Sequence, residues 1–420
     1  MASRATVLFL SQCLPYPPHT GVTNRTCNLL KQLHREFDVI LLAYYRVNHQ
    51  PTPEARQVAC QALAQFVTEV CQPVPIPAER SLVRRAWDHW RSLSANRAYT
   101  YYEYASDHFR DRLRAVLSRR SPDLVHIDSL DLHRWLCELP LRPQVCTHHN
   151  IESQLLRVRA ARVRSPIVAW YAGHQANLIE RLERRVCAQF ELNVTMSDLD
   201  AERLKRIAPT ARTIVVPNGV DTGYFQPRPS EAVIPGRVVF LGPMYMFPNR
   251  DAMDYCLREI WPIVRQGYGS ATLQVIGACS QSQRERYEQA PGVTCLGYVE
   301  DIRRHLAEAS CCIVPIRVGG GTRLKILDSW AMGRAVVSTS LGCEGLRTIN
   351  EGNIVIRDDA RGFAAAVLEV LSDPRMRARL ESGARRTAEE LYSWDRVGDT
   401  LRAAYRHLLG VVPATDTCNS

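Results

Sequence analysis

The segment 311–338 restricts the possible folds of this chain more than any other. Its two short apolar runs, 311–315 and 335–338, have the length and composition of buried strands. Between them lie three successive glycines, starting at Gly319, and a helical stretch that ends at Gly333. A strand, a turn, a helix and a second strand in this order form a unit of parallel α/β structure. We therefore predict a parallel sheet covered by helices.

The same alternation recurs along most of the 420 residues. Apolar runs of strand length alternate with helical patterns on both sides of the proline-spaced stretch 217–235, which is the best linker candidate. A chain of this length exceeds what one hydrophobic core usually organises. The pattern therefore predicts an α/β protein with two doubly wound, Rossmann-like domains that face each other across a cleft.

The domain boundaries follow from this linker. Residues 1–212 form the first domain in this prediction, and residues 213–392 form the second. A helix at 393–412 is expected to return to the first domain, and residues 413–420 are expected to be a frayed tail.

The charge of the chain narrows the classes of partner. The formal net charge is +10, which suits nucleic acid, anionic lipid or a phosphorylated substrate. No nucleic-acid-binding signature accompanies it, so we exclude nucleic acid. No window approaches eighteen uninterrupted apolar residues, and the run 7–10 has the character of a first strand and not of a signal peptide. We expect a cytoplasmic protein, with peripheral attachment to the inner face of a membrane left open.

Metal and disulfide chemistry find little support in the sequence. The fourteen cysteines show no CxxC spacing, which argues against a zinc site and against a disulfide framework. Asp198 and Asp200 have the spacing of a metal-binding pair, but they fall in the first turn of a predicted helix after Ser197. Negative charge is favoured there by the helix dipole, so we interpret them as capping residues.

The glycine turn before the helix predicts a phosphate site. Glycines let backbone N–H groups approach a ligand, and the start of a helix attracts anions. Thr322 is placed to cap this helix, and Arg323 and Lys325 add two cationic donors. Asp328, about a turn and a half further on, places a carboxylate where it could accept hydrogen bonds from ribose hydroxyls. The alternative is a turn that serves packing alone.

Two further apolar runs are predicted strands of the first sheet, and the residues that follow them place polar groups at the edge of that sheet. The apolar runs 123–127 and 144–147 end in polar residues, and the second leads into His148 and His149. Ligands of open parallel sheets bind outside the carboxyl ends of the strands. One imidazole is therefore expected at the edge of a ligand crevice, while the other packs or orients it.

Three motifs together resemble the retaining glycosyltransferases of family four, which have the GT-B fold. They are 217–221 with Phe225, the run 319–328, and 336–346. The resemblance extends over nearly the whole chain. It implies an enzyme that moves a sugar from a nucleotide-diphosphate donor to an acceptor and keeps the anomeric configuration, with neither a metal nor a cofactor.

The resemblance also implies roles for single residues. Asp328 takes the place of the second glutamate of the family's E-x7-E motif and bonds the ribose, whereas Gly320 stands where the first glutamate would be. Gly21 matches the glycine that approaches the donor phosphates, and His149 matches the histidine that reaches the donor sugar. Glu344 either meets sugar hydroxyls or caps a following helix.

One cationic pair of the family is missing. Members carry an arginine and a lysine after the first strand of the second domain, but this chain has residues 243–249 there, with Arg250 as the nearest cation. Our hypothesis is that Arg323 and Lys325 supply the charge that the leaving group needs. The predicted catalytic residues are His149, Arg323 and Lys325, and the predicted donor-binding residues are Gly21, Gly320, Gly321, Thr322, Asp328 and Glu344.

These features predict a glycosyltransferase that acts on a glycan or a lipid-linked acceptor in surface polysaccharide synthesis. The arginines at 157, 159, 162 and 164 either hold the enzyme at an anionic membrane or form an ordinary solvated helix face. An NAD-dependent oxidoreductase is disfavoured because no GxGxxG follows an early strand. A sugar-nucleotide epimerase and a non-catalytic nucleotide-sugar-binding protein of the same fold remain as alternatives.

Overall fold

The computed structural model describes residues 4–79, 81–139, 143–163, 165–227, 233–319 and 323–410. It divides the chain into two compact units. The first unit contains the residues up to Pro217 and those from Val397 onward, and the second contains Asn218–Arg396. Within the described residues, all neighbouring strands of the two sheets pair in parallel. The prediction of two doubly wound parallel-sheet domains is thus confirmed.

The first sheet has the strand order β3-β2-β1-β5-β6-β7-β8, with β4 paired beside β2. Its central strands are buried on both faces, which is typical of a parallel sheet between helical layers. The bounds are β1 Thr6–Ser11, β2 Asp38–Tyr45, β3 Glu69–Val70, β4 Val74–Pro75, β5 Leu124–Ile127, β6 Gln144–Thr147, β7 Leu192–Thr195 and β8 Thr213–Val215.

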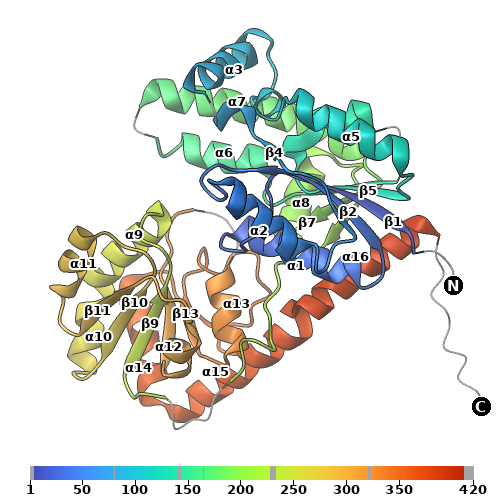
Figure 1. Ribbon diagram of the computed structural model, residues 1–420. Helices are drawn as coiled ribbons and strands as arrows, with labels where there is room; N and C mark the ends of the chain where they lie inside the picture. The colour runs from blue at the N-terminus through green and yellow to red at the C-terminus, as the bar shows by residue number, and fades with distance from the viewer. Residues whose placement is uncertain are drawn as a thin grey trace, which may run out of the picture. The chain divides into compact units, whose positions relative to one another are not determined.

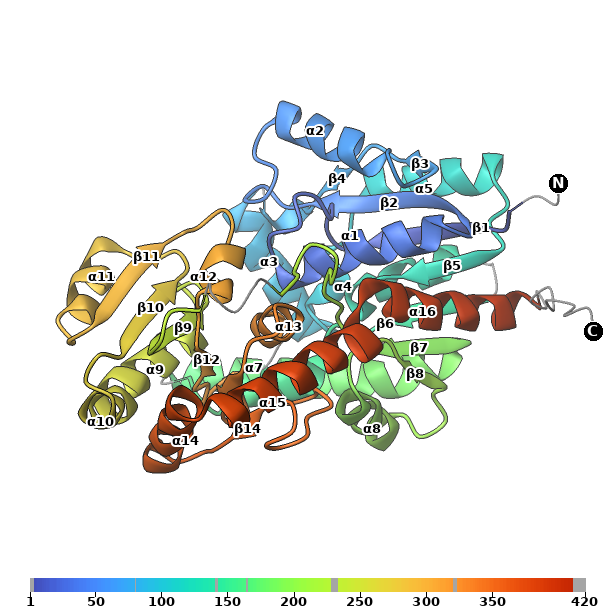
Figure 2. The ribbon, with the colours of Figure 1, turned by 90° about the horizontal axis from the view of Figure 1, so that it is seen from below.

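Helices cover both faces of this sheet. In Figure 1, α5 and α6 lie above the strands and α1 lies below them, and Figure 2 shows α1 and α16 in front of the strands when the molecule is seen from below. The bounds are α1 Gly21–His34, α2 Pro53–Leu63, α3 Leu82–Ser94, α4 Thr100–Glu103, α5 Asp107–Arg119, α6 Glu152–Ala160, α7 Pro166–Val186, α8 Asp198–Ile207 and α16 Trp394–Leu409, with short 3-10 turns at Pro77–Glu79, Leu130–Glu138 and Cys187–Gln189.

The second sheet has the order β11-β10-β9-β12-β13-β14. Strand order reverses between β9 and β12, and in open parallel sheets a ligand crevice forms at such a switch point. The bounds are β9 Arg237–Leu241, β10 Thr272–Ile276, β11 Val293–Gly297, β12 Cys311–Val314, β13 Val336–Ser338 and β14 Val355–Ile356.

The helices of the second unit enclose a core that is rich in aromatic side chains. Trp261, Trp330 and Phe240 are fully buried in it. The helix α14 packs against α10, β12 and β13, and α13 packs against α15. The bounds are α9 Phe247–Tyr255, α10 Trp261–Gly267, α11 Gln281–Glu288, α12 Arg303–Ala307, α13 Leu324–Ala331, α14 Ala360–Ser372 and α15 Pro374–Thr387, with π-helical turns at Cys256–Ile260 and Ala388–Tyr392.

The boundary between the units differs from the expected one at 212/213. Thr213–Val215 pairs with β7 as the last strand of the first sheet, so the chain enters the second unit only after Pro217. At the other end, α16 is anchored in the first unit from Val397 onward. Arg402 donates to the Gln32 carbonyl at 2.9 Å, and Tyr405 is fully buried. The expected tail 413–420 lies outside the described residues.

Candidate active site

Two glycines shape the edge of the second sheet beside its switch point. Gly242 follows β9 at φ +150°, and Gly277 follows β10 at φ +145°. A Cβ atom on Gly277 would come within 2.2 Å of the Gly242 carbonyl oxygen. Backbone therefore packs directly on backbone there, and no larger residue fits without a shift of the chain. This close packing fixes the loop that leads from β9 into α9.

The glycine-rich turn that follows β12 is described at its two ends. Gly319 has φ +102°, and a Cβ atom there would lie 2.7 Å from the Pro248 ring, so the turn begins against the start of α9. Gly320, Gly321 and Thr322, three predicted donor-binding residues, lie outside the described residues. Helix α13 begins after Arg323, whose side chain makes no capping hydrogen bond. Gly333, at φ +63°, ends the helical segment as predicted.

Lys325 lies in the first turn of α13 and points toward β9. Its Nζ donates to Asn249 Oδ1 at 2.8 Å and lies 4.6 Å from the centre of the Phe240 ring. Asn249 in turn donates to the Pro243 carbonyl at 2.9 Å, so its side chain is fixed. Burial, reinforced by the nearby Arg323 guanidinium, lowers the pKa of Lys325 to about 7. A nearby anion would favour the charged ammonium.

Arg323 pairs with Glu344 from the loop after β13. The Arg323 Nε donates to the Glu344 carbonyl at 3.4 Å, and its guanidinium lies 3.7 Å from the Glu344 carboxylate. Only 10% of the Arg323 side chain is exposed. Glu344 belongs to a run of turns and not to the start of a helix, so the capping alternative for Glu344 is wrong. The turn is set by Thr339, whose hydroxyl accepts from the Gly342 N–H at 2.9 Å.

Asp328 lies one turn after Lys325 on α13. Burial raises the pKa of its carboxyl to about 7. Within the described ranges, no side chain or amide donates a hydrogen bond to that carboxyl. The helix thus holds a cation and a carboxyl that are both partly deprived of water. Phosphate oxygens near Lys325 and hydroxyl donors near Asp328 would stabilise the charged forms of both groups.

A second polar group lies at the carboxyl edge of the first sheet. Asp128 follows β5, and its Oδ1 lies 3.5 Å from Nε2 of His149, which follows β6. The other Asp128 oxygen accepts from the hydroxyls of Thr26 at 2.6 Å and Ser11 at 3.3 Å. Burial opposes ionisation of Asp128, but His149 and these donors outweigh it and lower the pKa of the carboxyl. Asp128 therefore faces the His149 ring, although Oδ1 and Nε2 form no hydrogen bond with each other.

The two neighbouring histidines have different surroundings. His148 is buried, and its Nε2 lies 2.9 Å from Asn193 Oδ1. Burial lowers the pKa of His148 to about 4, so the ring is neutral and packs in the core. Of the two roles predicted for His148, packing or orienting its neighbour, the structure supports packing.

The helix α1 begins at Gly21, the predicted glycine of the phosphate-approaching loop. Thr20 and Thr23 form a capping box around this start. Arg25, one turn into α1, is buried and donates to the carbonyls of Val216 at 2.6 Å and Pro217 at 2.7 Å. Arg25 thus anchors the end of the first unit's main segment, while Gly21 stays a predicted donor contact.

Asp198 and Asp200 lie in the first turn of α8, as predicted. Ser197 caps α8 by accepting from the Asp200 N–H at 3.1 Å, and Asp200 pairs with Arg203. Within the described part of the chain, no three His, Cys, Asp or Glu side chains form a group that could hold a metal ion. No described helix is long and apolar enough to cross a bilayer.

Sequence reasoning missed two residues of these sites, Asn249 and Asp128. Asn249 lies in the stretch 243–249, where family members carry a cationic pair. It has no charge, and its side chain accepts a hydrogen bond from Lys325. Asp128 directly follows a buried strand, which is the signal that could have found it. The structure joins Arg323, Lys325, Asp328 and Glu344 around the first turns of α13 in the second unit, and it joins His149 to Asp128 in the first.

Two protein-family models match the chain. The model described as "Glycosyltransferase Family 4" matches residues 19–224, and the model described as "Glycosyl transferases group 1" matches residues 235–373. The two matches fall on the two sheets and together extend over most of the chain.

Named proteins resemble parts of this chain. The phosphatidyl-myo-inositol mannosyltransferase of Mycolicibacterium smegmatis is 28% identical over 228 residues, which are 52% of this chain and 57% of that protein. A D-inositol 3-phosphate glycosyltransferase of Geodermatophilus obscurus is 30% identical over 47% of this chain and 48% of its own length. The chain thus spans about half the length of the curated relatives it matches.

Solved structures share the fold over almost the whole chain. Sucrose-phosphate synthase of Thermosynechococcus elongatus has a TM-score of 0.68 at 15% identity, covering 97% of this chain and 100% of that one. Anabaena HepE in complex with UDP has a TM-score of 0.65 at 13% identity, covering 96% and 100%. The galactosyltransferase WaaB of the lipopolysaccharide outer core has a TM-score of 0.61 at 12% identity, covering 96% and 99%. The fold is GT-B.

Proposed function

Because this chain belongs to the glycosyltransferases of family four, we propose that it transfers a sugar from a nucleotide-diphosphate donor to a hydroxyl acceptor with retention of configuration. Solved structures of the same fold include complexes with UDP and with UDP-glucose. Their low identity supports only the fold, so the nucleotide and the sugar of this chain are open to experiment.

The observation that carries this proposal is the position of Lys325 and Asp328 one helical turn apart on α13. Their pKa values, both displaced to about 7 by burial, fit a site whose ligand brings the missing opposite charge and hydrogen-bond donors. The diphosphate would lie at the start of α13, close to Lys325 and Arg323, and Asp328 would accept from ribose hydroxyls. Gly320, Gly321 and Thr322 are proposed to supply backbone contacts.

The transfer step needs no metal in this proposal. The acceptor oxygen bonds to the anomeric carbon on the face from which the diphosphate departs, and the bond from that carbon to the β-phosphate oxygen breaks. The acceptor proton passes to the β-phosphate, which leaves as nucleoside diphosphate. Arg323 and Lys325 stabilise the charge that develops on this leaving group. Glu344 holds Arg323 and meets sugar hydroxyls.

The first unit contributes the acceptor side. His149, which faces Asp128, is proposed to reach the donor sugar, and Gly21 is proposed to approach the donor phosphates. A glycan or a lipid-linked glycan is the proposed acceptor, in the synthesis of a surface polysaccharide. Such an acceptor places the enzyme in the cytoplasm, at the inner face of an anionic membrane, with Arg157, Arg159 and Arg162 near the lipid. Arg164 lies outside the described residues.

A second candidate function is a nucleotide-sugar-binding protein without catalysis. Gly320 favours it, because this residue replaces the glutamate that many family members place beside the donor sugar. The epimerase alternative has no supporting acid/base constellation in the sequence.

Incubation with a panel of nucleotide sugars tests these functions together. Thermal shift measures binding, and released nucleoside diphosphate measures turnover with and without a polyol or glycan acceptor. Acceptor-dependent release supports the transferase. A thermal shift without release supports the non-catalytic protein, and an isomerised sugar nucleotide without release supports the epimerase. No shift with any nucleotide sugar contradicts all three functions.

A further inference from the structure

Three of the seven tryptophans in this chain are exposed, and all three lie on α3 and α7 of the first unit. The exposed fractions are 52% for Trp87, 55% for Trp90 and 62% for Trp170. The other four tryptophans, at 135, 261, 330 and 394, are each exposed by no more than 7%. Large aromatic side chains in water are costly, so their concentration on one helix pair needs a physical reason.

Helix α3 turns its apolar side to water. Val83, Trp87 and Trp90 follow the i, i+4, i+7 spacing of one helix face, and the two indoles stack with ring centres 4.6 Å apart. The side that packs inward is polar, since Asp88 and Ser92 are the buried residues of α3. This arrangement is the reverse of an ordinary surface helix of a soluble protein.

The start of α7 continues the apolar surface. Ile167 is 78% exposed and lies in the same exposed helix turn as Trp170. Two hydrogen bonds tie α7 to α3: the Tyr171 hydroxyl lies 2.6 Å from His89 Nδ1, and Gln175 Nε2 donates to Ser92 Oγ at 2.8 Å. We call the exposed apolar side chains of this pair the apolar face; they are Leu82, Val83, Trp87, Trp90, Ile167, Val168 and Trp170.

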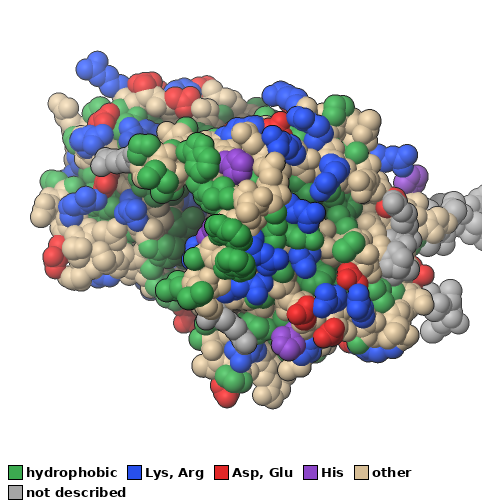
Figure 3. All heavy atoms as spheres, turned by 90° about the horizontal axis from the view of Figure 1, so that it is seen from above, with side chains coloured by type: hydrophobic (Ala, Val, Ile, Leu, Met, Phe, Trp, Pro, Cys, Tyr) green, Lys and Arg blue, Asp and Glu red, His purple; other side chains and the backbone are tan. Residues whose placement is uncertain are grey.

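Positive charge borders the apolar face. The segment 157–170 contains four arginines and no acidic residue. The described arginines of this segment, Arg157, Arg159 and Arg162, are exposed. Figure 3 looks down on the side of the first unit that carries α3 in Figure 1, and it shows hydrophobic side chains beside a group of Lys and Arg.

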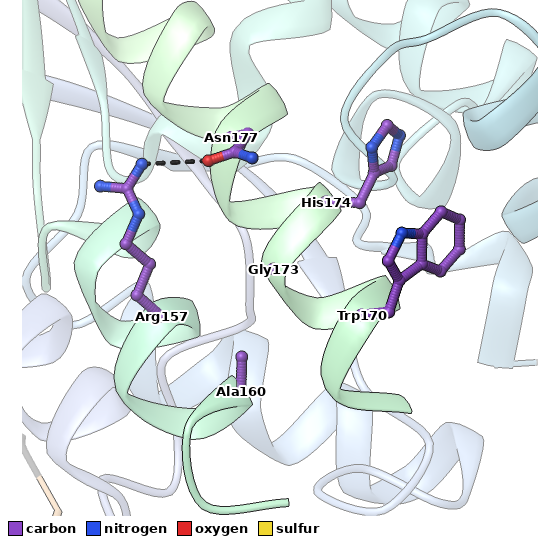
Figure 4. Close-up of a pocket in the computed structure, with 6 residues that line it drawn as sticks. All are labelled: Arg157, Ala160, Trp170, Gly173, His174 and Asn177. Atoms are coloured by element: carbon purple, nitrogen blue, oxygen red, sulfur yellow. Dashed lines mark hydrogen bonds between the residues drawn. The ribbon is translucent and has the colours of Figure 1, made fainter. Parts of the chain in front are cut away.

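A groove between α6 and α7 opens next to this charge. Its volume is about 390 Å³, and it is lined by Arg157, Ala160, Trp170, Gly173, His174 and Asn177. In Figure 4, Arg157 with Asn177 and Trp170 with His174 lie on either side of Gly173. Arg157 donates to Asn177 Oδ1 at 3.1 Å and also pairs with Glu180. The His174 Nε2 is buried and has no hydrogen-bond partner among the described residues.

We propose that the apolar face docks on an anionic phospholipid bilayer and that the α6–α7 groove takes a phosphate headgroup. Tryptophan, leucine and isoleucine enter the boundary between headgroups and acyl chains, while arginines meet the lipid phosphates. Arg157, which lines the groove, supplies donors for a phosphate oxygen. This inference rests on the proposed function only in that a lipid-linked acceptor requires such a surface.

Vesicle binding by the full chain tests the surface directly. Co-sedimentation with phosphatidylcholine vesicles is compared with that for vesicles of phosphatidylcholine and phosphatidylglycerol. We expect binding only to the second kind, weakened by salt, with a blue shift of tryptophan emission, because the exposed indoles are all on α3 and α7. Equal binding to both vesicles, or binding without a blue shift, would overturn the proposal, as would no binding at all.

Gly173 offers a sharp variant for the groove. Gly173 lines the groove and a Cβ atom there meets nothing within 4 Å, so Gly173→Leu should narrow the groove while leucine favours the helix. We expect it to weaken binding to anionic vesicles about fivefold, the loss expected for one basic contact at the membrane. Gly173→Ala is the matched control and should bind as the parent does. Equal binding by Gly173→Leu would remove the groove from the proposal.

The apolar face is tested by the double variant Trp87→Ser and Trp90→Ser. Its matched control is Ile349→Ser, an exposed apolar residue of the second unit. The double variant should lose most vesicle binding, whereas the control should lose none. A partner protein or a second copy of the chain is the competing occupant. Self-association of the parent without lipid that the double variant abolishes would therefore overturn the bilayer assignment.

Binding of UDP or UDP-glucose in solution separates this inference from the proposed function. It is measured by calorimetry in the absence of lipid. If nucleotide binding is present and vesicle binding is absent, only the docking surface is wrong. If vesicle binding is present and no nucleotide sugar binds or reacts, only the proposed function is wrong.

Discussion

The carboxyl edges of the two sheets carry similar residue types in opposite states. At the first edge, Asp128 is fully buried, accepts hydrogen bonds from Thr26 and Ser11, and lies 3.5 Å from His149. At the second edge, Asp328 is also withdrawn from water, but no described donor reaches its carboxyl. Burial raises the pKa of both carboxyls, but at Asp128 the neighbouring His149 and Thr26 outweigh burial and lower the pKa, whereas at Asp328 the pKa stays raised.

The comparison separates a structural carboxylate from one that awaits a ligand. A buried charge that the protein satisfies by itself contributes to stability, and its loss leaves other groups unpaired. A buried charge without a partner costs stability, and a ligand that supplies the partner gains affinity. Substitutions around Asp128 should therefore change the free energy of unfolding, whereas substitutions around Asp328 should change ligand binding and turnover.

The largest expected effect is on catalysis at the second edge. Arg323→Ala and Lys325→Ala should each lower turnover about a hundredfold, or roughly 2.7 kcal/mol, because each removes a cation from the developing charge on the leaving group. Steady-state release of nucleoside diphosphate measures it. Arg258→Ala, at an exposed arginine of the same unit, is the control and should leave turnover unchanged. Unchanged kinetics in both variants would show that these cations do not replace the missing pair.

Next in size is a contrast in stability between two isosteric changes. Asp128→Asn should lower the free energy of unfolding by about 2 kcal/mol, because it removes the charge that Thr26 and His149 compensate. Asp328→Asn should leave stability unchanged within about 0.5 kcal/mol, since it removes an uncompensated charge. Urea denaturation followed by circular dichroism measures both. If both variants lost the same free energy of unfolding, the two carboxylates would not differ in their contribution to stability.

The pH response of Lys325 is the third prediction. Its pKa is lowered to about 7 from 10.5, so the unfolded chain binds more protons than the folded chain between these values. The free energy of unfolding therefore rises with pH through that window. The cost of keeping the charged ammonium in the folded chain is fully present below about pH 7. A bound diphosphate stabilises the charged Lys325 ammonium and raises its pKa, so binding of UDP at pH 8 should take up about one proton. Each unit by which this pKa rises corresponds to about 1.4 kcal/mol of interaction with the charged form.

Calorimetry in buffers of different ionisation enthalpy measures this proton uptake. The variant Lys325→Met keeps the length of the apolar side chain and removes the titrating amine, so uptake should disappear. Uptake that persists in Lys325→Met would assign the proton to another group.

The smallest expected effect concerns the first unit. Tyr405 of α16 contacts His126 Nδ1 with its hydroxyl, and the other nitrogen of that ring lies 2.9 Å from the Thr147 hydroxyl. Tyr405→Phe should lower the free energy of unfolding by about 1 kcal/mol, the contribution of one buried hydrogen bond. Denaturant titration checks it, and turnover should be unaffected. A loss of turnover would connect α16 to the reaction.

The elements with strong local signals could be predicted from the sequence. Alternating apolar runs and helical patterns identified two parallel sheets, and Gly333 marked the end of a helix because positive φ suits glycine. The boundary near 213 was placed too early, because a short polar-flanked run cannot reveal which sheet it joins. Thr213–Val215 belongs to the first sheet through pairing with β7, a contact between segments distant from the linker signal.

Residues of the candidate sites could be named from the sequence, but their contacts could not. Arg323, Lys325 and Asp328 were found from their spacing after the glycines. Asn249 was not found, because its role depends on the close packing of two loops that only the folded backbone shows. The pairing of Asp128 with His149 depends likewise on β5 and β6 lying side by side in the sheet.

The divided first unit has a consequence for synthesis on the ribosome. Its sheet is built from the first half of the chain, yet Tyr405 and Leu401 complete its core from the last helix. The second unit is continuous, so all its residues have emerged before Val397, where the last helix enters the first unit. Domains usually fold in order from the N-terminus as they are made. Here the first segment to emerge is the last to be completed, because its core stays open until α16 has been made.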